Sequence, residues 1–132
     1  LRKKIREFGL EIEVDSAGTS SYHIGDPPDS RMSETAKKFG VSIEDLTARQ
    51  FGVIDFDQFD LIYAMDTSNY TDIVSLARND KDVSKVKLIL NESHPGQDLN
   101  VPDPYYGGDQ GFIDVFKLLD KATDVIMKNI TN

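Results

Sequence analysis

The residues best suited by type and spacing to do chemistry lie in the run Val-Pro-Asp-Pro-Tyr-Tyr at positions 101–106. Its aspartate, Asp103, stands between two prolines. The first proline has a fixed φ angle, and the second restricts the residue before it to an extended backbone, so the carboxylate is carried on a stiff segment. An acid held in this way suits general acid or base catalysis. The rings of Tyr105 and Tyr106 beside it suit the walls of a slot for a flat substrate.

The same run has two simpler interpretations. In one, Asp103 is an ordinary turn residue and the two tyrosines are half-buried packing residues. In the other, Asp103 joins Asp98 and Asp109 as a set of carboxylate ligands for a hard metal ion. The spacing of these three acids matches no calcium loop, so solvated side chains are favoured over a metal site. We expect neither a metal nor another cofactor.

Other residue types that often carry chemistry are isolated in this sequence. Asp66 follows the run Leu-Ile-Tyr-Ala-Met and could imitate the phosphate-accepting aspartate of a response-regulator receiver. A receiver also needs a pair of acids after an earlier strand, and residues 15–18 (Asp-Ser-Ala-Gly) provide no such pair. We therefore interpret Asp66 as the N-cap of a helix. His23 and His94 each stand alone, and the sequence has no P-loop, dinucleotide-binding, zinc-protease or nucleophile-elbow motif.

Composition and charge exclude several classes of function. The 132 residues are 39% hydrophobic and 29% charged, as in a globular protein, and one domain is expected over residues 1–132. The 15 Lys and Arg against 23 Asp and Glu give a net charge of −8, which disfavours binding to nucleic acid or to an acidic membrane. The sequence contains no cysteine, hence no disulfide, thiolate zinc site or thiol nucleophile among these residues. No part of it resembles a signal peptide, and it has no apolar run of about 20 residues, so the cytoplasm is the expected compartment.

Hydrophobic periodicity predicts the elements that position these residues. Period-two alternation and short apolar runs predict three strands, and apolar residues at helical spacing predict four helices. Alternating strands and helices indicate an α/β domain with a parallel sheet. The expected strands span 10–14, 59–65 and 86–90, and the expected helices span 1–8, 30–39, 66–78 and 112–129.

A functional site is expected at the carboxyl ends of these strands, where ligands bind in open α/β sheets. Three segments should meet there: 16–22, 66–69 and 91–111. The last is a loop of about twenty residues, and in a small domain loops longer than about 12–15 residues are usually functional or disordered.

The first residues predict that part of the fold precedes this sequence. Leu1, Ile5 and Phe8 share one helical face and Gly9 ends the helix, but no capping residue stands before Leu1. Three strands are few for this number of helices, and one more strand ahead of Leu1 would correct the imbalance. We therefore expect a chain truncated at its N-terminus; the alternative is a short, frayed first helix.

Five short motifs, taken in order, resemble those of one enzyme family. Each is weak alone, but their order and spacing, over essentially all 132 residues, are similar to those of the low-molecular-weight protein tyrosine phosphatases. The motifs are Asp15-Ser16-Ala17-Gly18-Thr19, Gly25-Asp26-Pro27-Pro28-Asp29-Ser30-Arg31, Ala48-Arg49-Gln50, Asp60-Leu61-Ile62-Tyr63-Ala64-Met65-Asp66 with Asn69, and Asp103-Pro104-Tyr105-Tyr106-Gly107. The resemblance implies a flavodoxin-like, three-layer α/β/α fold with a four-stranded parallel sheet. Its first strand, central in the sheet, would be the part that precedes Leu1.

The resemblance also implies a reaction and roles for particular residues. In the family, a cysteine thiolate in a C-x5-R phosphate loop attacks phosphotyrosine and forms a cysteinyl phosphate. The aspartate matched by Asp103 protonates the leaving group and later acts as a base. Tyr22, Tyr105 and Tyr106 match positions that line the substrate slot, and Ser16 matches a serine that supports the phosphate loop. The implied substrates are phosphotyrosine proteins or small aryl phosphates.

Two departures from the family pattern bear on activity. Many members carry a histidine where this chain has Leu46, so support of the phosphate loop would differ. The cysteine and arginine of the phosphate loop are absent, so the 132 residues by themselves cannot run the reaction, and we expect both in the segment ahead of Leu1. Two alternatives stay open: a non-catalytic, phosphatase-like binding module, and an arsenate reductase on the same scaffold, which the Asp-Pro-Tyr-Tyr-Gly motif disfavours.

Overall fold

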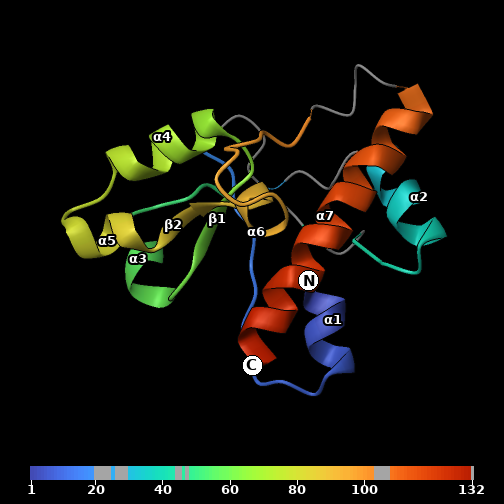
Figure 1. The fold of residues 1–132 in the computed structure, drawn as a ribbon, viewed down its shortest axis with the longest axis horizontal. Coiled ribbons are helices and arrows are strands. Elements are labelled where there is room, and N and C mark those ends of the chain that lie inside the picture. Colours follow the sequence, from blue (N-terminus) through green and yellow to red (C-terminus); the bar gives the residue numbers. More distant parts are fainter. Residues whose placement is uncertain (20–24, 26–29, 44–45, 47, 103–107, 132) are drawn as a thin grey trace.

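The computed structural model describes residues 1–19, 25, 30–43, 46, 48–102 and 108–131. Within these ranges the chain forms two strands and seven helices (Figure 1). The strands are β1 (Ile62–Ala64) and β2 (Val86–Leu88), and the helices are α1 (Arg2–Glu7), α2 (Ser30–Lys38), α3 (Asp55–Gln58), α4 (Thr67–Ser75), α5 (Asp80–Ser84), α6 (Leu90–Ser93) and α7 (Gly108–Thr131).

The sheet is parallel, with Ile62 beside Val86 and Ala64 beside Leu88. Helices α4 and α5 connect the two strands, and the apolar side chains of this unit form one core cluster. Its buried members come from α3, both strands and α4: Phe56, Ala64, Ile73, Val86 and Leu88. The cluster fixes α4 against the sheet and thereby sets where the first residues of α4 lie.

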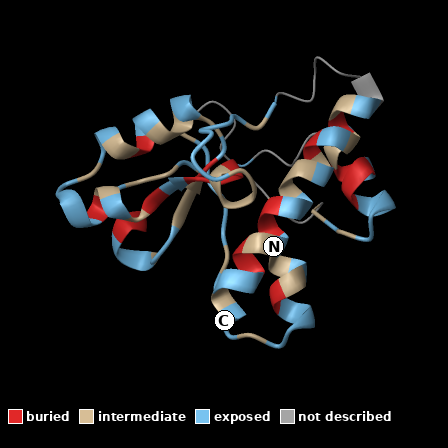
Figure 2. Cartoon of the chain, viewed as in Figure 1, coloured by how far each residue is buried: buried red, intermediate tan, exposed pale blue. Residues whose placement is uncertain are grey.

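The long helix α7 is the centre of a second part of the molecule, formed by α1, α2 and α7. Apolar residues recur along it every three or four positions, and Figure 2 shows buried and exposed positions alternating down its length. Helices α1 and α2 lie beside it (Figure 1). The Phe39 ring, just after α2, stacks on Phe116 at 4.5 Å between ring centroids, and Lys4 of α1 binds Asp124 of α7 at 2.7 Å. No helix in the described ranges has the length and apolar composition needed to cross a bilayer.

Helix α6 connects the unit of the two strands with the part formed by α1, α2 and α7. It follows β2 directly, and its buried Leu90 shares a second core cluster with Ile89, Ala122 and Ile126. The last two belong to α7, so the strands and the long helix are held together through this short helix.

Several predicted elements are confirmed, and one strand is wrong. The predicted strand 10–14 has no strand structure, and Ile12 is 38% exposed. An extended segment becomes a strand only when its backbone groups pair with a neighbour. In the part of the chain that the structure describes, the pairing of this region is limited to one parallel bridge between Gly18 and Gln50.

The other differences are shorter. Helices α3 and α5 were not predicted, because four or five residues are too few to show a helical period. Helix α4 ends at Ser75 instead of 78, and the predicted long loop contains α6 and ends at Gly108, where α7 begins. Phe8, predicted on the inner face of α1, is 65% exposed.

Candidate functional site

The carboxyl end of β1 leads into a capped helix. Asp66 has an extended backbone, and its carboxylate accepts a hydrogen bond from the Asn69 backbone N–H at 2.7 Å. This is the standard N-cap arrangement, which satisfies one of the four free N–H groups at a helix start. The interpretation of Asp66 as a cap is therefore confirmed.

The loop that leads to Asp103 is attached at the same place. The Val101 backbone N–H donates to the Met65 carbonyl oxygen at 2.8 Å. The Asn100 side-chain oxygen accepts from the backbone N–H of Thr67, the first residue of α4, also at 2.8 Å. Two consecutive loop residues thus hold the chain on either side of the β1–α4 junction.

The segment after residue 15 forms the third side of the site. Gly18 pairs with the segment at residues 49–51 of the same chain. Its N–H donates to the Arg49 carbonyl oxygen at 2.8 Å, and its carbonyl oxygen accepts from the Phe51 N–H at 2.7 Å. The Asn69 side chain donates to the Thr19 hydroxyl at 3.2 Å. Residues 18–19, 66–69 and 100–101, one part of each of the three predicted segments, therefore meet at the carboxyl end of β1.

An ion-pair network holds the 15–19 segment in place. The Arg49 guanidinium donates to Asp15 at 2.8 Å and, through two nitrogens, to Asp55 at 3.1 Å each. Asp55 also accepts from the Gly52 N–H. Burial alone would raise the pKa of Asp55, but Arg49 and the Gly52 N–H hold that pKa below its ordinary value. The Asp55 carboxylate therefore stays charged and holds the Arg49 guanidinium.

The predicted site residues divide into one that is described and four that are not. Ser16 is exposed, and its backbone N–H donates to the Asp15 carboxylate at 2.8 Å. Tyr22, Asp103, Tyr105 and Tyr106 lie outside the described residues, so their roles stay predictions.

Sequence reasoning missed Asn100 as an anchor and Asp55 as the partner of Arg49. The bond of Asn100 joins residues 33 positions apart, and no periodicity or motif marks such a pair.

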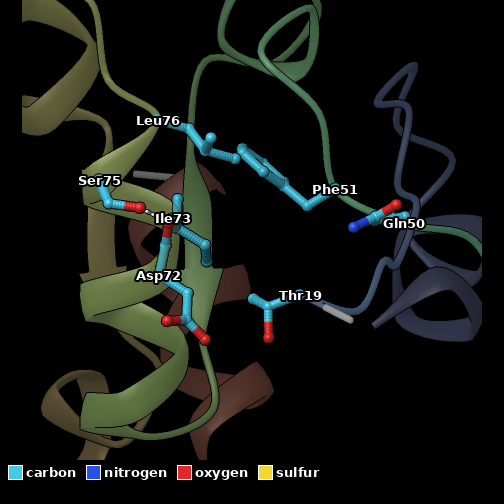
Figure 3. Close-up of a pocket in the computed structure, with 7 residues that line it drawn as sticks. All are labelled: Thr19, Gln50, Phe51, Asp72, Ile73, Ser75 and Leu76. Atoms are coloured by element: carbon cyan, nitrogen blue, oxygen red, sulfur yellow. Dashed lines mark hydrogen bonds between the residues drawn. The ribbon is translucent and has the colours of Figure 1, made fainter. Parts of the chain in front are cut away.

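A cavity of about 310 Å³ borders Thr19 (Figure 3). Figure 3 shows α4 on one side of it and the chain at 50–51 on the other. Its described lining includes the carboxylate of Asp72 and no cationic side chain, so its charge does not suit a phosphate group. The lining residues are Thr19, Gln50, Phe51, Asp72, Ile73, Ser75 and Leu76.

Comparison with known proteins gives one consistent result. The family model for low molecular weight phosphotyrosine protein phosphatases matches residues 1–132. A protein of Synechocystis sp., itself only provisionally assigned as a low molecular weight protein-tyrosine-phosphatase, is 46% identical over 93% of this chain and 78% of its own length. The low molecular weight phosphotyrosine protein phosphatase of Schizosaccharomyces pombe is 37% identical over 98% of this chain and 83% of its own.

The fold is similar to that of a solved relative. The crystal structure of a protein tyrosine phosphatase from Entamoeba histolytica superimposes with a TM-score of 0.89 at 32% identity. The match covers 98% of this chain and 83% of the other. It confirms the predicted fold class, a flavodoxin-like α/β arrangement with a parallel sheet.

Proposed function

The chain belongs to the low molecular weight phosphotyrosine protein phosphatase family, a family of hydrolases, and from that premise we propose that the intact protein hydrolyses phosphotyrosine through a cysteinyl-phosphate intermediate. Asp103 acts as general acid and then as general base. The observation that carries this proposal is the attachment of the loop just before Asp103 to the carboxyl end of β1, where ligands bind in this class of sheet.

The proposed reaction has two steps. In the first, a cysteine thiolate attacks phosphorus, the bond between phosphorus and the tyrosine oxygen breaks, and Asp103 gives its proton to the departing phenolate. In the second, water attacks the phosphorus of the cysteinyl phosphate and Asp103 takes a proton from that water. The sulfur–phosphorus bond breaks, which releases inorganic phosphate and restores the thiolate.

The thiolate must come from outside the 132-residue sequence, which has no cysteine. We place it, with the phosphate-binding arginine, in a C-x5-R loop ahead of Leu1. Two arginines of the described chain already serve carboxylates: Arg49 binds Asp15 and Asp55, and Arg78 binds Asp57 and Asp82. Neither of these two is therefore proposed as the arginine that binds the phosphate.

The substrates proposed are phosphotyrosine proteins and small aryl phosphates. Tyr22, Tyr105 and Tyr106 would line the slot for the aromatic ring, and Ser16 would support the phosphate loop. Residues 1–132 would form one domain together with the preceding segment, and the cytoplasm remains the proposed compartment.

The decisive experiment replaces the proposed acid in the full-length protein. Asp103→Asn should lower kcat for phosphotyrosine by about 10²–10⁴-fold, which is roughly 3–5 kcal/mol at 1.36 kcal/mol per decade. It should do less harm with an aryl phosphate whose leaving group is a weak base and needs little protonation. Asp98→Asn, in the same loop but bonded to Asn91, is the matched control and should keep the wild-type dependence on leaving-group pKa.

Variants of the two slot tyrosines test substrate binding separately from proton donation. Tyr105→Ala and Tyr106→Ala should raise KM for aromatic substrates and leave the leaving-group dependence intact. A loss below about threefold for Asp103→Asn on phosphotyrosine, or parallel leaving-group plots for wild type and variant, would remove Asp103 from its role. A full-length protein that binds phosphotyrosine without hydrolysing it would instead identify a binding module.

A further inference from the structure

We propose that Asn100 is a positioning residue for the general acid: its side chain fastens the start of the Asp103 loop to the first turn of α4. The inference rests on the proposed function, since it assigns Asn100 a part in the work of Asp103. The observations that carry it are the contacts of residues 65–69 and 100–101.

The first step is the hydrogen bond itself. The Asn100 side-chain oxygen lies 2.8 Å from the Thr67 backbone nitrogen, and Thr67 is the first residue of α4. The N–H groups of a helix's first turn have no partner within the helix. Asp66 supplies the partner for Asn69, and Asn100 supplies the one for Thr67. The helix start is therefore capped in part by a side chain from the catalytic loop.

The second step is that this bond works with another. The Val101 N–H donates to the Met65 carbonyl oxygen at 2.8 Å. Without Asn100 the loop would be held at Val101 alone, by this bond and by the packing of its side chain against the second core cluster. Two bonds from adjacent residues, to Met65 and to Thr67 on either side of Asp66, also fix the direction in which the chain leaves. The bond of Val101 joins two backbone groups, so only the bond of the Asn100 side chain can be removed by a substitution.

The third step is the short path to the acid. Asp103 lies two residues after Val101, and two residues span at most about 7 Å. The φ angle of the intervening Pro102 is fixed by its ring, so few torsions are free to absorb a change at Asn100. A misplacement of about 1 Å in a reacting group can cost up to about 10²-fold in rate. The loss of the Asn100 bond should therefore be felt as poorer proton donation.

The same loop contains a matched control. The Asn91 side-chain oxygen accepts from the Asp98 backbone N–H at 2.9 Å, and its amide nitrogen donates to the Asp98 carboxylate at 3.0 Å. Asn91 is the same residue type as Asn100 and likewise accepts from a backbone N–H, although it lies in α6, at the beginning of the loop, and makes one additional bond. These bonds, however, tie the loop to its own beginning and not to the β1–α4 junction.

The test uses the full-length protein with Asn100→Ala, Asn100→Leu, Asn100→Asp, Asn91→Ala and Asp103→Asn. For each variant kcat is measured at its pH optimum on phosphotyrosine and on an aryl phosphate with a weakly basic leaving group, together with the thermal midpoint. Asn100→Ala and Asn100→Leu should lose about three- to tenfold on phosphotyrosine, the scale of one hydrogen bond, and less than about twofold on the second substrate. Asn100→Asp keeps the acceptor oxygen and should return to within about twofold of wild type.

Three results would overturn the role of Asn100. They are an equal loss on both substrates, no rescue by Asn100→Asp, or the same leaving-group-dependent loss in Asn91→Ala. If Asp103→Asn shows the leaving-group dependence and the acceptorless Asn100 variants do not, Asn100 alone loses its role and the proposed function stands. If Asp103→Asn also lacks that dependence, both proposals fail.

Discussion

Tyr63, in the middle of β1, ends in a polar network that spans three elements. Its hydroxyl donates to Glu92 of α6 at 3.1 Å, and the other oxygen of Glu92 accepts from Asn129 of α7 at 3.0 Å. Burial, the Glu92 charge and this hydrogen bond together raise the pKa of Tyr63 to about 12. The phenol therefore stays protonated in the folded protein over a range in which it ionises in the unfolded chain.

This shift predicts how stability changes in alkali. Since the folded-state pKa lies above the unfolded value of about 10, the contribution of Tyr63 is complete below pH 10 and is lost as the pH rises to 12. Ionisation of Tyr63 should lower the free energy of unfolding of the wild type by about 1 kcal/mol between pH 10 and 12, since partial solvent exposure reduces the effect. Tyr63→Phe should lack this loss. Glu92→Gln should give an intermediate slope. Identical slopes for wild type and Tyr63→Phe between pH 9 and 12 would contradict the assignment.

At the scale of elements, two helices begin with the same kind of cap but differ in what they hold. Asp66 at the start of α4 accepts from the Asn69 N–H at 2.7 Å, and Asn79 at the start of α5 accepts from the Asp82 N–H at 2.9 Å. Both cap residues have an extended backbone. The start of α4 also binds Asn100; for α5 the described contacts show no hydrogen bond to residues 100–101.

Removing each cap should separate stability from catalysis. Asp66→Ala and Asn79→Ala should each lower the free energy of unfolding by about 1 kcal/mol, measured by urea unfolding of the full-length protein. Asp66→Ala should also lower kcat for phosphotyrosine, because fraying of the first turn of α4 frees Asn100, whereas Asn79→Ala should leave kcat unchanged. A similar fall in kcat for both variants would mean that general loosening, and not the start of α4, controls the loop.

At the scale of the whole molecule, the described sheet is thin, and on one side of β1 the described residues supply no partner strand. Among the described residues β1 pairs with β2 alone, and the residues at its two ends are apolar and exposed, Leu61 by 46% and Met65 by 41%. An unpaired strand edge with apolar neighbours is a template for pairing with another chain.

The 132-residue polypeptide produced by itself should therefore associate. We expect aggregates or exchanged dimers in sedimentation experiments at micromolar concentration, and a broad thermal transition. The full-length protein is the control and should melt sharply if its additional residues cover this edge. A monomeric 132-residue polypeptide with a sharp transition would show that the open edge is harmless.

Local patterns in the sequence determined the helix faces, one helix cap and the fold class of this protein. The spacing of apolar residues over 112–126 predicts the buried face of α7. Four of the six predicted residues are buried, Phe112, Val115, Ala122 and Ile126, whereas Phe116 and Leu119 are partly buried. The position of Asp66 before an apolar helical pattern predicts its cap. These predictions succeed because a helix and its cap depend on residues within one or two turns of each other. The order of short motifs also indicated the family and, with it, the α/β fold.

Tertiary structure alone decided which distant residues meet. The predicted strand 10–14 fails because strand formation depends on a partner far along the chain, which alternation in one segment does not reveal. The link between Asn69 and Thr19 joins residues 50 positions apart, and that between Asn100 and Thr67 joins residues 33 apart. Such pairs leave no period in the sequence, since each bond depends on where the core places two separate segments. The meeting of residues 18–19, 66–69 and 100–101 at the carboxyl end of β1 could be predicted, but the side chains that hold these segments together could not.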